Sequence, residues 1–425
     1  MGLVAIIFVA SLLLGFPMAF VLGYGGLAHL IAMNQESFFS VVTQRMFTGV
    51  NSYSLMCIPF FILAGDIMNM GGITERLLDF AREAIGWIRG GMAYCCVVLA
   101  MVLSAILGSA NAVCAILCAV LVNEMRKDGY DEDFTGSLIC ASGVLGPIIP
   151  PSVTFIIYGV LTGVSVQRMF MAGIVPGVML AIGYVTVILY FTRKRGYKKA
   201  KEHFDIHTFG KSFVRSIPAL IVPVIIIGGI VGGVFTPTES GAIAVVAAII
   251  ASLIYRSFDF KKLPSVLLKT GISTAAIMYI VAFGNIMGWT FAMDGVPAKI
   301  TNAILGLTTN KYLIILLILI ALAVIGCLME AFAAMYIFVP VFVPLAQAIG
   351  MDEVHFGIVL CLMFTIGLMT PPVGMLLFVT SNMAKIQLSK LSKSVAPFAL
   401  AAFIVVLILA YCPPLTTFIP NMLGM

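Results

Sequence analysis

Charged residues are scarce in this sequence. Only 10% of the 425 residues are charged and 61% are hydrophobic, whereas soluble globular domains are about 25% charged. A soluble protein cannot bury this much apolar surface, so most of the chain must face lipid or pack between helices that do. A helix that crosses a bilayer needs roughly 20 apolar residues, and such runs recur along the whole chain. The composition predicts an all-α polytopic membrane protein.

The motifs of several enzyme classes are absent. The sequence contains no GxxxxGK[ST] loop, which argues against direct use of ATP. It has neither HExxH nor GxSxG and only four histidines, so an intramembrane protease or lipid transferase is disfavoured. The nine cysteines form no CxxC motif and lie mostly in apolar runs, so we expect buried thiols. No basic region precedes the first apolar run, so residues 1–23 are not expected to be a cleaved signal.

The positive charges predict the orientation in the membrane. Segments 91–125 and 312–346 are long and interrupted by small and polar residues, so we expect each to be a hairpin that enters and leaves on one side. With this assignment 20 of the 24 Lys and Arg residues share one side, which is the cytoplasmic side by the positive-inside rule. The C-terminus is then external. Gly15-Phe16-Pro17 interrupts the first segment and leaves the side of the N-terminus open. The four exceptions are Arg45, Arg168, Lys299 and Lys311.

The positive charge of +6 does not indicate nucleic-acid binding, because it is spread over loops between apolar runs. The densest basic run, Arg193–Lys201, is expected to anchor the cytoplasmic face beside anionic lipid.

An internal repeat is the most informative feature. The pattern Gly-x-Asp-Glu-x-x-x-Gly starts at Gly129 and again at Gly350, and Gly-x-x-x-Pro-Pro starts at Gly146 and again at Gly367. Both pairs are 221 residues apart. The first loop is predicted to be cytoplasmic and its copy external, so the repeats are inverted, as in many secondary transporters. The alternative is an old duplication that now serves only packing. The predicted units are repeat one at about 1–192, a cytoplasmic basic linker at about 193–215, and repeat two at about 216–411.

Each repeat carries two consecutive prolines inside an apolar segment, Pro150-Pro151 and Pro371-Pro372. Proline has no amide proton and disturbs the residue before it, so both helices should be broken there. Free carbonyls are costly in hydrocarbon unless they are buried or line a polar cavity. A small hard cation prefers such oxygens. The prolines therefore predict two cation sites at matching positions, against the alternative of simple kinks.

The hairpins have candidate tips at residues 108–112 and 329–333, where Ser109 and Glu330 occupy equivalent positions. A carboxylate within an apolar stretch is usually functional. Glu330 can ligate a cation, carry a proton or cap a helix. For Asp66, also within a segment, we favour helix packing or gating. Thr236 or Thr238 is expected to cap the helix that follows, and Glu239 suits its first turn; the alternative for this loop is a contact with substrate.

Four further motifs are distributed over nearly the whole chain. They are Ser54–Gly65 (SLMCIPFFILAG), Gly146–Ser152 (GPIIPPS), Phe235–Glu239 (FTPTE) and Thr370–Gly374 (TPPVG). Together they resemble those of the large membrane subunit of tripartite ATP-independent periplasmic (TRAP) transporters. The resemblance implies an elevator-type fold of the ion-transporter superfamily with two inverted repeats, each with a re-entrant hairpin and a broken helix. It implies sodium-driven import of organic acids, with a separate small membrane subunit of about four helices and a periplasmic substrate-binding protein.

The resemblance also implies site residues. Sodium site one is Ser109 with Gly146, Ile149 and Pro151, and sodium site two is Glu330 with Gly367, Thr370 and Pro372. Substrate is expected between the two tips, near Asn111, Ser152 and Thr154. One departure is Leu107, which has no side-chain oxygen where related proteins can carry serine.

We therefore expect a multi-pass protein of the bacterial inner membrane that imports a small carboxylate with Na⁺ as coupling ion. The alternative is a stand-alone ion-coupled anion transporter or antiporter of the same superfamily, which needs no binding protein.

Overall fold

The computed structural model describes residues 2–200 and 203–424, and all helices and turns below lie within them. The α-helices are α1 Gly2–Leu13, α2 Met18–Ala32, α3 Phe39–Val50, α4 Cys57–Met70, α5 Ile73–Ile85, α6 Gly91–Leu107, α7 Ala110–Lys127, α8 Glu132–Gly143, α9 Val153–Thr162, α10 Val166–Arg195, α11 Ile206–Val231, α12 Pro237–Ile254, α13 Leu263–Met293, α14 Val296–Leu307, α15 Lys311–Leu328, α16 Ala331–Ala348, α17 Glu353–Gly367, α18 Met375–Ala384, α19 Leu388–Ser394, α20 Ala396–Tyr411 and α21 Pro414–Met422.

The lengths and surfaces of these helices fit a bilayer. Seven helices are long and apolar enough to cross a membrane, or eight if the bent pair α19–α20 forms one span. On α11, Val222 and Ile226 are fully buried, whereas Val224 between them is 67% exposed. In water such a face would be costly, but hydrocarbon solvates it. The prediction of an all-α polytopic membrane protein is confirmed.

Each segment predicted as a hairpin contains two helices joined by a sharp turn. In the first hairpin, α6 and α7, Gly108 has a left-handed φ of +58° and Ser109 is extended. In the second hairpin, α15 and α16, the turn is made by extended Met329 and Glu330. The second arms, Ala110–Lys127 and Ala331–Ala348, begin and end 221 residues apart, as do the repeated sequence motifs.

Both double-proline segments are unwound. The first unwound segment, residues 144–152, separates α8 from α9, and the second, residues 368–374, separates α17 from α18. The Pro150-Pro151 and Pro371-Pro372 peptide bonds are both cis. The missing amide protons of paired prolines explain why neither helix continues. The predicted interruptions are therefore confirmed.

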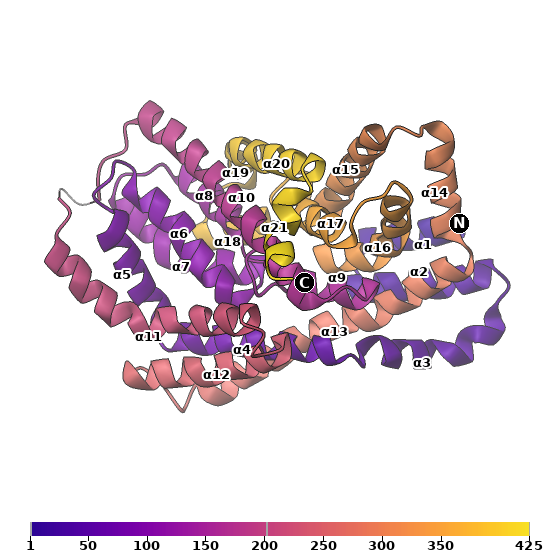
Figure 1. The fold of residues 1–425 in the computed structure, drawn as a ribbon, viewed down its shortest axis with the longest axis horizontal. Coiled ribbons are helices and arrows are strands. Elements are labelled where there is room, and N and C mark those ends of the chain that lie inside the picture. Colours follow the sequence, from indigo (N-terminus) through magenta and orange to yellow (C-terminus); the bar gives the residue numbers. More distant parts are fainter. Residues whose placement is uncertain (1, 201–202, 425) are drawn as a thin grey trace.

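Helices α11, α12, α4, α13 and α3 run along one edge of the molecule in Figure 1, with the hairpins and broken helices beside them. Helix α4 packs against α12, α13 and α6, and α13 packs against α2, α3 and α16. The pair α4 and α13 therefore faces both hairpins, and this contact frames the cavity described below.

Two local expectations are also met. The first apolar segment is broken between Leu13 and Met18, where Gly15 has a left-handed φ. Thr236 and Glu239 form a capping box at the start of α12, in which each side chain accepts from the other residue's backbone N–H. The cysteines are free thiols, seven of them buried.

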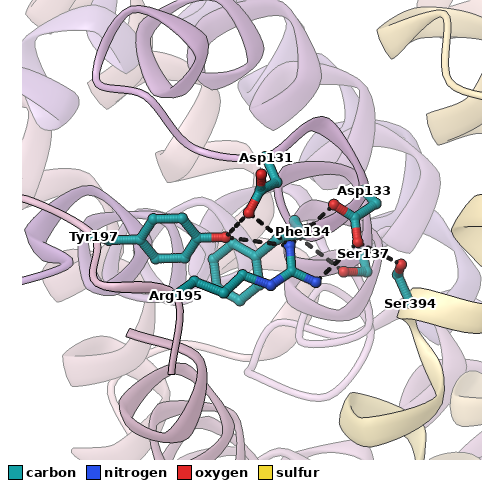
Figure 2. A network of polar contacts seen from close by, with 7 residues as sticks. All are labelled: Asp131, Asp133, Phe134, Ser137, Arg195, Tyr197 and Ser394. Carbon is teal, nitrogen blue, oxygen red and sulfur yellow. Dashed lines mark hydrogen bonds and ion pairs between the residues drawn. The ribbon is translucent and has the colours of Figure 1, made fainter. Parts of the chain in front are cut away.

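A polar network joins three elements on the predicted cytoplasmic side (Figure 2). The Arg195 guanidinium at the end of α10 lies 2.8 Å from Asp131 and 3.0 Å from Asp133, at the start of α8. Ser394 of α19 donates to Asp133 at 2.9 Å. Burial raises the pKa of Tyr197, so its hydroxyl stays protonated and donates to Asp131 at 2.7 Å. Paired charge-assisted bonds of this kind are stronger than single surface ion pairs.

Arg195→Ala is expected to lower the melting temperature of the detergent-purified protein by a few degrees, because about 2 kcal/mol of charge-assisted bonding is lost. The matched control is Lys194→Ala, since the exposed Lys194 on the same helix has a polar contact with its neighbour Tyr190 but no ion pair with any described residue. Thermal unfolding followed by fluorescence measures both. Equal melting temperatures for Arg195→Ala and the wild type would show that the network adds no stability.

Candidate functional site

The tip of the first hairpin lies directly on the first unwound segment. A Cβ atom added at Gly108 would lie 2.6 Å from the Pro151 carbonyl oxygen, and one added at Gly146 would lie 2.7 Å from that of Ser109. The Val153 N–H donates to the Gly108 carbonyl at 3.5 Å. The structure therefore brings together Ser109, Gly146 and Pro151, three residues predicted for sodium site one, and glycine makes the close approach possible.

Several carbonyl oxygens of the first unwound segment have no hydrogen-bond donor among the described residues. Within the described residues, the carbonyls of Gly146, Ile149 and Pro151 accept no hydrogen bond. Gly146 and Pro151 are buried and Ile149 is half-buried. Buried carbonyls without donors are costly in hydrocarbon. Their oxygens are the donor type that a hard cation prefers.

The second hairpin contacts the second unwound segment in a different way. A Cβ atom at Gly367 would collide with the backbone of Gly326, and the Val373 N–H donates to the Cys327 carbonyl at 3.3 Å. The second hairpin thus meets the second unwound segment one turn before its tip. Thr370 Oγ1 donates to the Ile366 carbonyl at 2.8 Å, and Pro372 is exposed to solvent or lipid. The second hairpin therefore contacts Gly367 through Gly326, whereas the hydrogen bonds of Glu330 at its tip stay within the hairpin.

Glu330 caps the second arm of its hairpin. Its Oε2 accepts hydrogen bonds from the backbone N–H groups of Phe332 and Ala333, at 2.9 and 3.2 Å. The capping role that the sequence left open is therefore observed. Capping uses only part of the acceptor capacity of the Glu330 side chain, because an ionised carboxylate has two oxygens with about four acceptor positions.

A cavity of about 140 Å³ lies between the hairpin tips and the helix pair α4 and α13. Tip one contributes Leu107, Ser109 and Ala112, and the start of α9 contributes Val153. The second hairpin contributes Phe332. The opposite wall consists of Ile62 and Asp66 of α4 and Lys269, Ser273 and Ile277 of α13.

Lys269 and Asp66 form an ion pair in the wall of this cavity. The Lys269 Nζ atom lies 2.6 Å from Asp66 Oδ1, and Thr270 Oγ1 donates to Asp66 Oδ2 at 3.3 Å. Lys269 is among the 20 Lys and Arg residues that the sequence places on the cytoplasmic side, and it was not predicted as a site residue. The signal that could have indicated it is the spacing of Lys269, Ser273 and Ile277, which are four residues apart and so share one face of a helix.

Two of the three residues predicted near the substrate, Ser152 and Thr154, flank the cavity-lining residue Val153. Ser152 and Thr154 are buried, and both hydroxyls donate to the Pro147 carbonyl, Thr154 at 2.9 Å. Val153 between them faces the cavity instead. Asn111 is exposed, and its amide lies 3.3 Å from the Met375 sulfur. The structure does not bring Asn111 together with Ser152 and Thr154.

Comparison with known proteins gives consistent matches over nearly the full chain. The family profile described as "Tripartite ATP-independent periplasmic transporter, DctM component" matches residues 5–415. A putative TRAP transporter large permease protein of Haemophilus influenzae is 37% identical, covering 96% of each chain. The sialic acid TRAP transporter large permease protein SiaM of Vibrio cholerae is 34% identical over 96% of this chain and 95% of its own. The C4-dicarboxylate TRAP transporter large permease protein DctM of Pseudomonas aeruginosa is 33% identical over 95% and 94%.

A solved structure has the same fold at much lower sequence similarity. The Alcanivorax borkumensis YdaH transporter superposes with a TM-score of 0.65 at 13% identity, covering 96% of this chain and 97% of its own. At that identity the likeness concerns the fold alone. The relatives above are transport permeases, not enzymes.

Proposed function

Because this chain belongs to the DctM family of large permease subunits of TRAP transporters, we propose that it imports a small carboxylate across the bacterial inner membrane with sodium as the coupling ion. The observation that carries the proposal is the first hairpin tip seated on an unwound segment with unsatisfied carbonyls. A family of transport permeases needs an energy source, and oxygens without hydrogen donors offer a binding place for a cation.

The proposed sodium site one consists of Ser109 and the carbonyls of Gly146, Ile149 and Pro151. The close approach of Ser109 to Gly146 supports it. The proposed site two consists of Glu330 and Thr370 with the carbonyls of Gly367 and Pro372. The close approach of Gly326 in the second hairpin to Gly367 supports it.

The proposed mechanism is an elevator movement of the two hairpins and broken helices against a scaffold that contains α4 and α13. Two inverted repeats, at about 1–192 and 216–411, would give the transport unit equivalent outward and inward positions. The repetition of helix bounds at the 221-residue spacing supports the duplication. The proposed cytoplasmic linker between the repeats is at about 193–215.

The carboxylate is proposed from the relatives, two of which are named for sialic acid and C4-dicarboxylates. The cavity between the hairpin tips is the proposed place for it, near Asn111, Ser152 and Thr154. A small membrane subunit and a periplasmic substrate-binding protein are the proposed partners. The binding protein would deliver the substrate, and anionic lipid would contact the basic cytoplasmic face.

Sodium is a sufficient driver on energetic grounds. One net positive charge that moves inward across about 100 mV releases roughly 2.3 kcal/mol. Two sodium ions with one monoanion would carry one such charge. A sodium concentration gradient adds to this term.

Uptake by proteoliposomes tests the proposal. The permease is reconstituted with the small subunit and the binding protein from its gene neighbourhood, and labelled succinate and sialic acid are offered. We expect uptake under an inward sodium gradient and little uptake under a proton gradient alone. Uptake driven only by protons would contradict sodium coupling. Full uptake without the binding protein would favour the stand-alone transporter.

A further inference from the structure

We propose that Lys269 binds the carboxylate of the transported substrate from the scaffold side, and that Asp66 competes with the substrate for this lysine. The inference rests on the proposed function, import of a small carboxylate. It adds a specificity-determining pair, Lys269 and Asp66, that lies outside the hairpins and unwound segments.

The ion pair of Lys269 and Asp66 lies in the wall of the proposed substrate cavity. Lys269 and Asp66 both line the cavity that Ser109 of the first tip and Phe332 of the second hairpin also line. Among the described residues that line it, Lys269 is the only cation and Asp66 the only anion. An organic anion in this cavity therefore meets one fixed positive charge, and that charge already has a partner.

The geometry of the pair allows an exchange of partners. The Asp66 side chain is only 14% exposed and is held by Thr270, whereas the Lys269 side chain is 66% exposed. Asp66 is thus the fixed member and the lysine amine is the mobile one. A lysine offers three donors on a flexible stem, so its amine can turn from Asp66 toward a carboxylate beside Ser109.

The position along α13 gives the exchange a direction. Lys269 follows the predicted cytoplasmic end of α13, while Ser273 and Ile277 lie one and two turns deeper on the same face. A substrate that descends with the hairpin tips meets Lys269 last, near the cytoplasm. When Asp66 forms its ion pair with Lys269 again, the substrate in the inward position loses its positively charged partner. Lys269 therefore assists substrate binding, and Asp66 assists substrate release.

The two partners should have opposite effects on transport. Lys269→Gln removes the charge that receives the carboxylate, so KM for uptake is expected to rise roughly 10- to 100-fold. Asp66→Asn removes the competitor, so KM is expected to fall while kcat also falls, because release slows. Lys269→Arg keeps the charge and should retain most of the uptake. If the ion pair only fastened α4 to α13, Lys269→Gln and Asp66→Asn would have the same effect.

The test measures initial uptake of labelled succinate and sialic acid by proteoliposomes that contain the complete transporter. The matched control is Lys262→Gln, because Lys262 is equally exposed and pairs with Asp259 at 3.7 Å just outside α13. Melting temperatures establish that each variant is folded. Opposite shifts in KM with an unchanged control support the inference. Shifts in the same direction, or an unchanged KM for Lys269→Gln, would overturn it.

Failure of the proposed function gives a different result. If the wild type takes up neither carboxylate, the proposed function is wrong and this inference falls with it. If the wild type takes up either one and Lys269→Gln matches it, the function stands and the role of Lys269 is refuted.

Discussion

Replacing Gly146 by alanine is expected to reduce carboxylate uptake by more than about tenfold, because the new methyl group occupies the contact between the first hairpin tip and the first unwound segment. The added Cβ would lie 2.7 Å from the Ser109 carbonyl oxygen and 2.8 Å from its carbon. Both are backbone atoms and cannot rotate away. The tip must withdraw, and the oxygens proposed for sodium site one then separate.

The matched control for this substitution is Gly271→Ala. Gly271 lies within α13, and a Cβ atom there meets nothing within 4 Å. Alanine is the better helix former, so this change should be neutral or slightly stabilising. Uptake and its sodium dependence are measured for both variants in proteoliposomes. Normal sodium-driven uptake by Gly146→Ala would show that close contact of tip and segment is unnecessary.

Glu330→Gln is expected to raise the sodium concentration for half-maximal uptake roughly 10- to 100-fold, since it removes a charge from the proposed sodium site two. The amide keeps the length of the side chain and an oxygen that can still accept from Phe332 and Ala333. The melting temperature should therefore change little. Capping and cation binding are separated in this way, because capping needs an acceptor and cation binding gains most from the negative charge.

The control for Glu330→Gln is Glu353→Gln, which also neutralises one carboxylate of the second repeat. Glu353 is bonded to Gln347 at the exposed start of α17, away from the hairpin tip. Its sodium dependence should equal that of the wild type. An unchanged sodium requirement in Glu330→Gln would leave Glu330 with the capping role alone.

The interruptions of the helices were predictable because they follow from local chemistry. Two consecutive prolines remove two neighbouring amide donors, so Pro150-Pro151 and Pro371-Pro372 strongly disfavour a continued helix. Gly108 marks the first hairpin turn, which has a positive φ. The second tip has no such local signal, and its position followed from the repeat. Repetition of these signals 221 residues apart strengthened each of them.

Several short helices were not predicted. Helix α5, Ile73–Ile85, contains Glu75, Arg76, Asp79 and Arg82. A search for long apolar runs does not find such a segment, because its charged residues interrupt the apolar ones. Helices α3 and α14, each of 12 residues, are shorter than the roughly 20 residues of a membrane-spanning run and were also not predicted.

Pairings between distant segments were beyond the sequence. The ion pair of Asp66 with Lys269 joins positions 203 residues apart, and no repeat or motif links them. The hydroxyls of Ser152 and Thr154 were expected near substrate, yet both turn to the Pro147 carbonyl. The direction of a side chain beside an unwound segment depends on tertiary packing, which single-sequence patterns do not contain.

Binding of radioactive sodium to the purified permease tests the central claim most directly. If the two unwound segments hold cations, the wild type binds sodium at two saturable sites, and Gly146→Ala and Glu330→Gln each lose a different one. Gly271→Ala and Glu353→Gln keep both. Full sodium binding by Gly146→Ala and Glu330→Gln, or the absence of saturable binding in the wild type, would contradict the account.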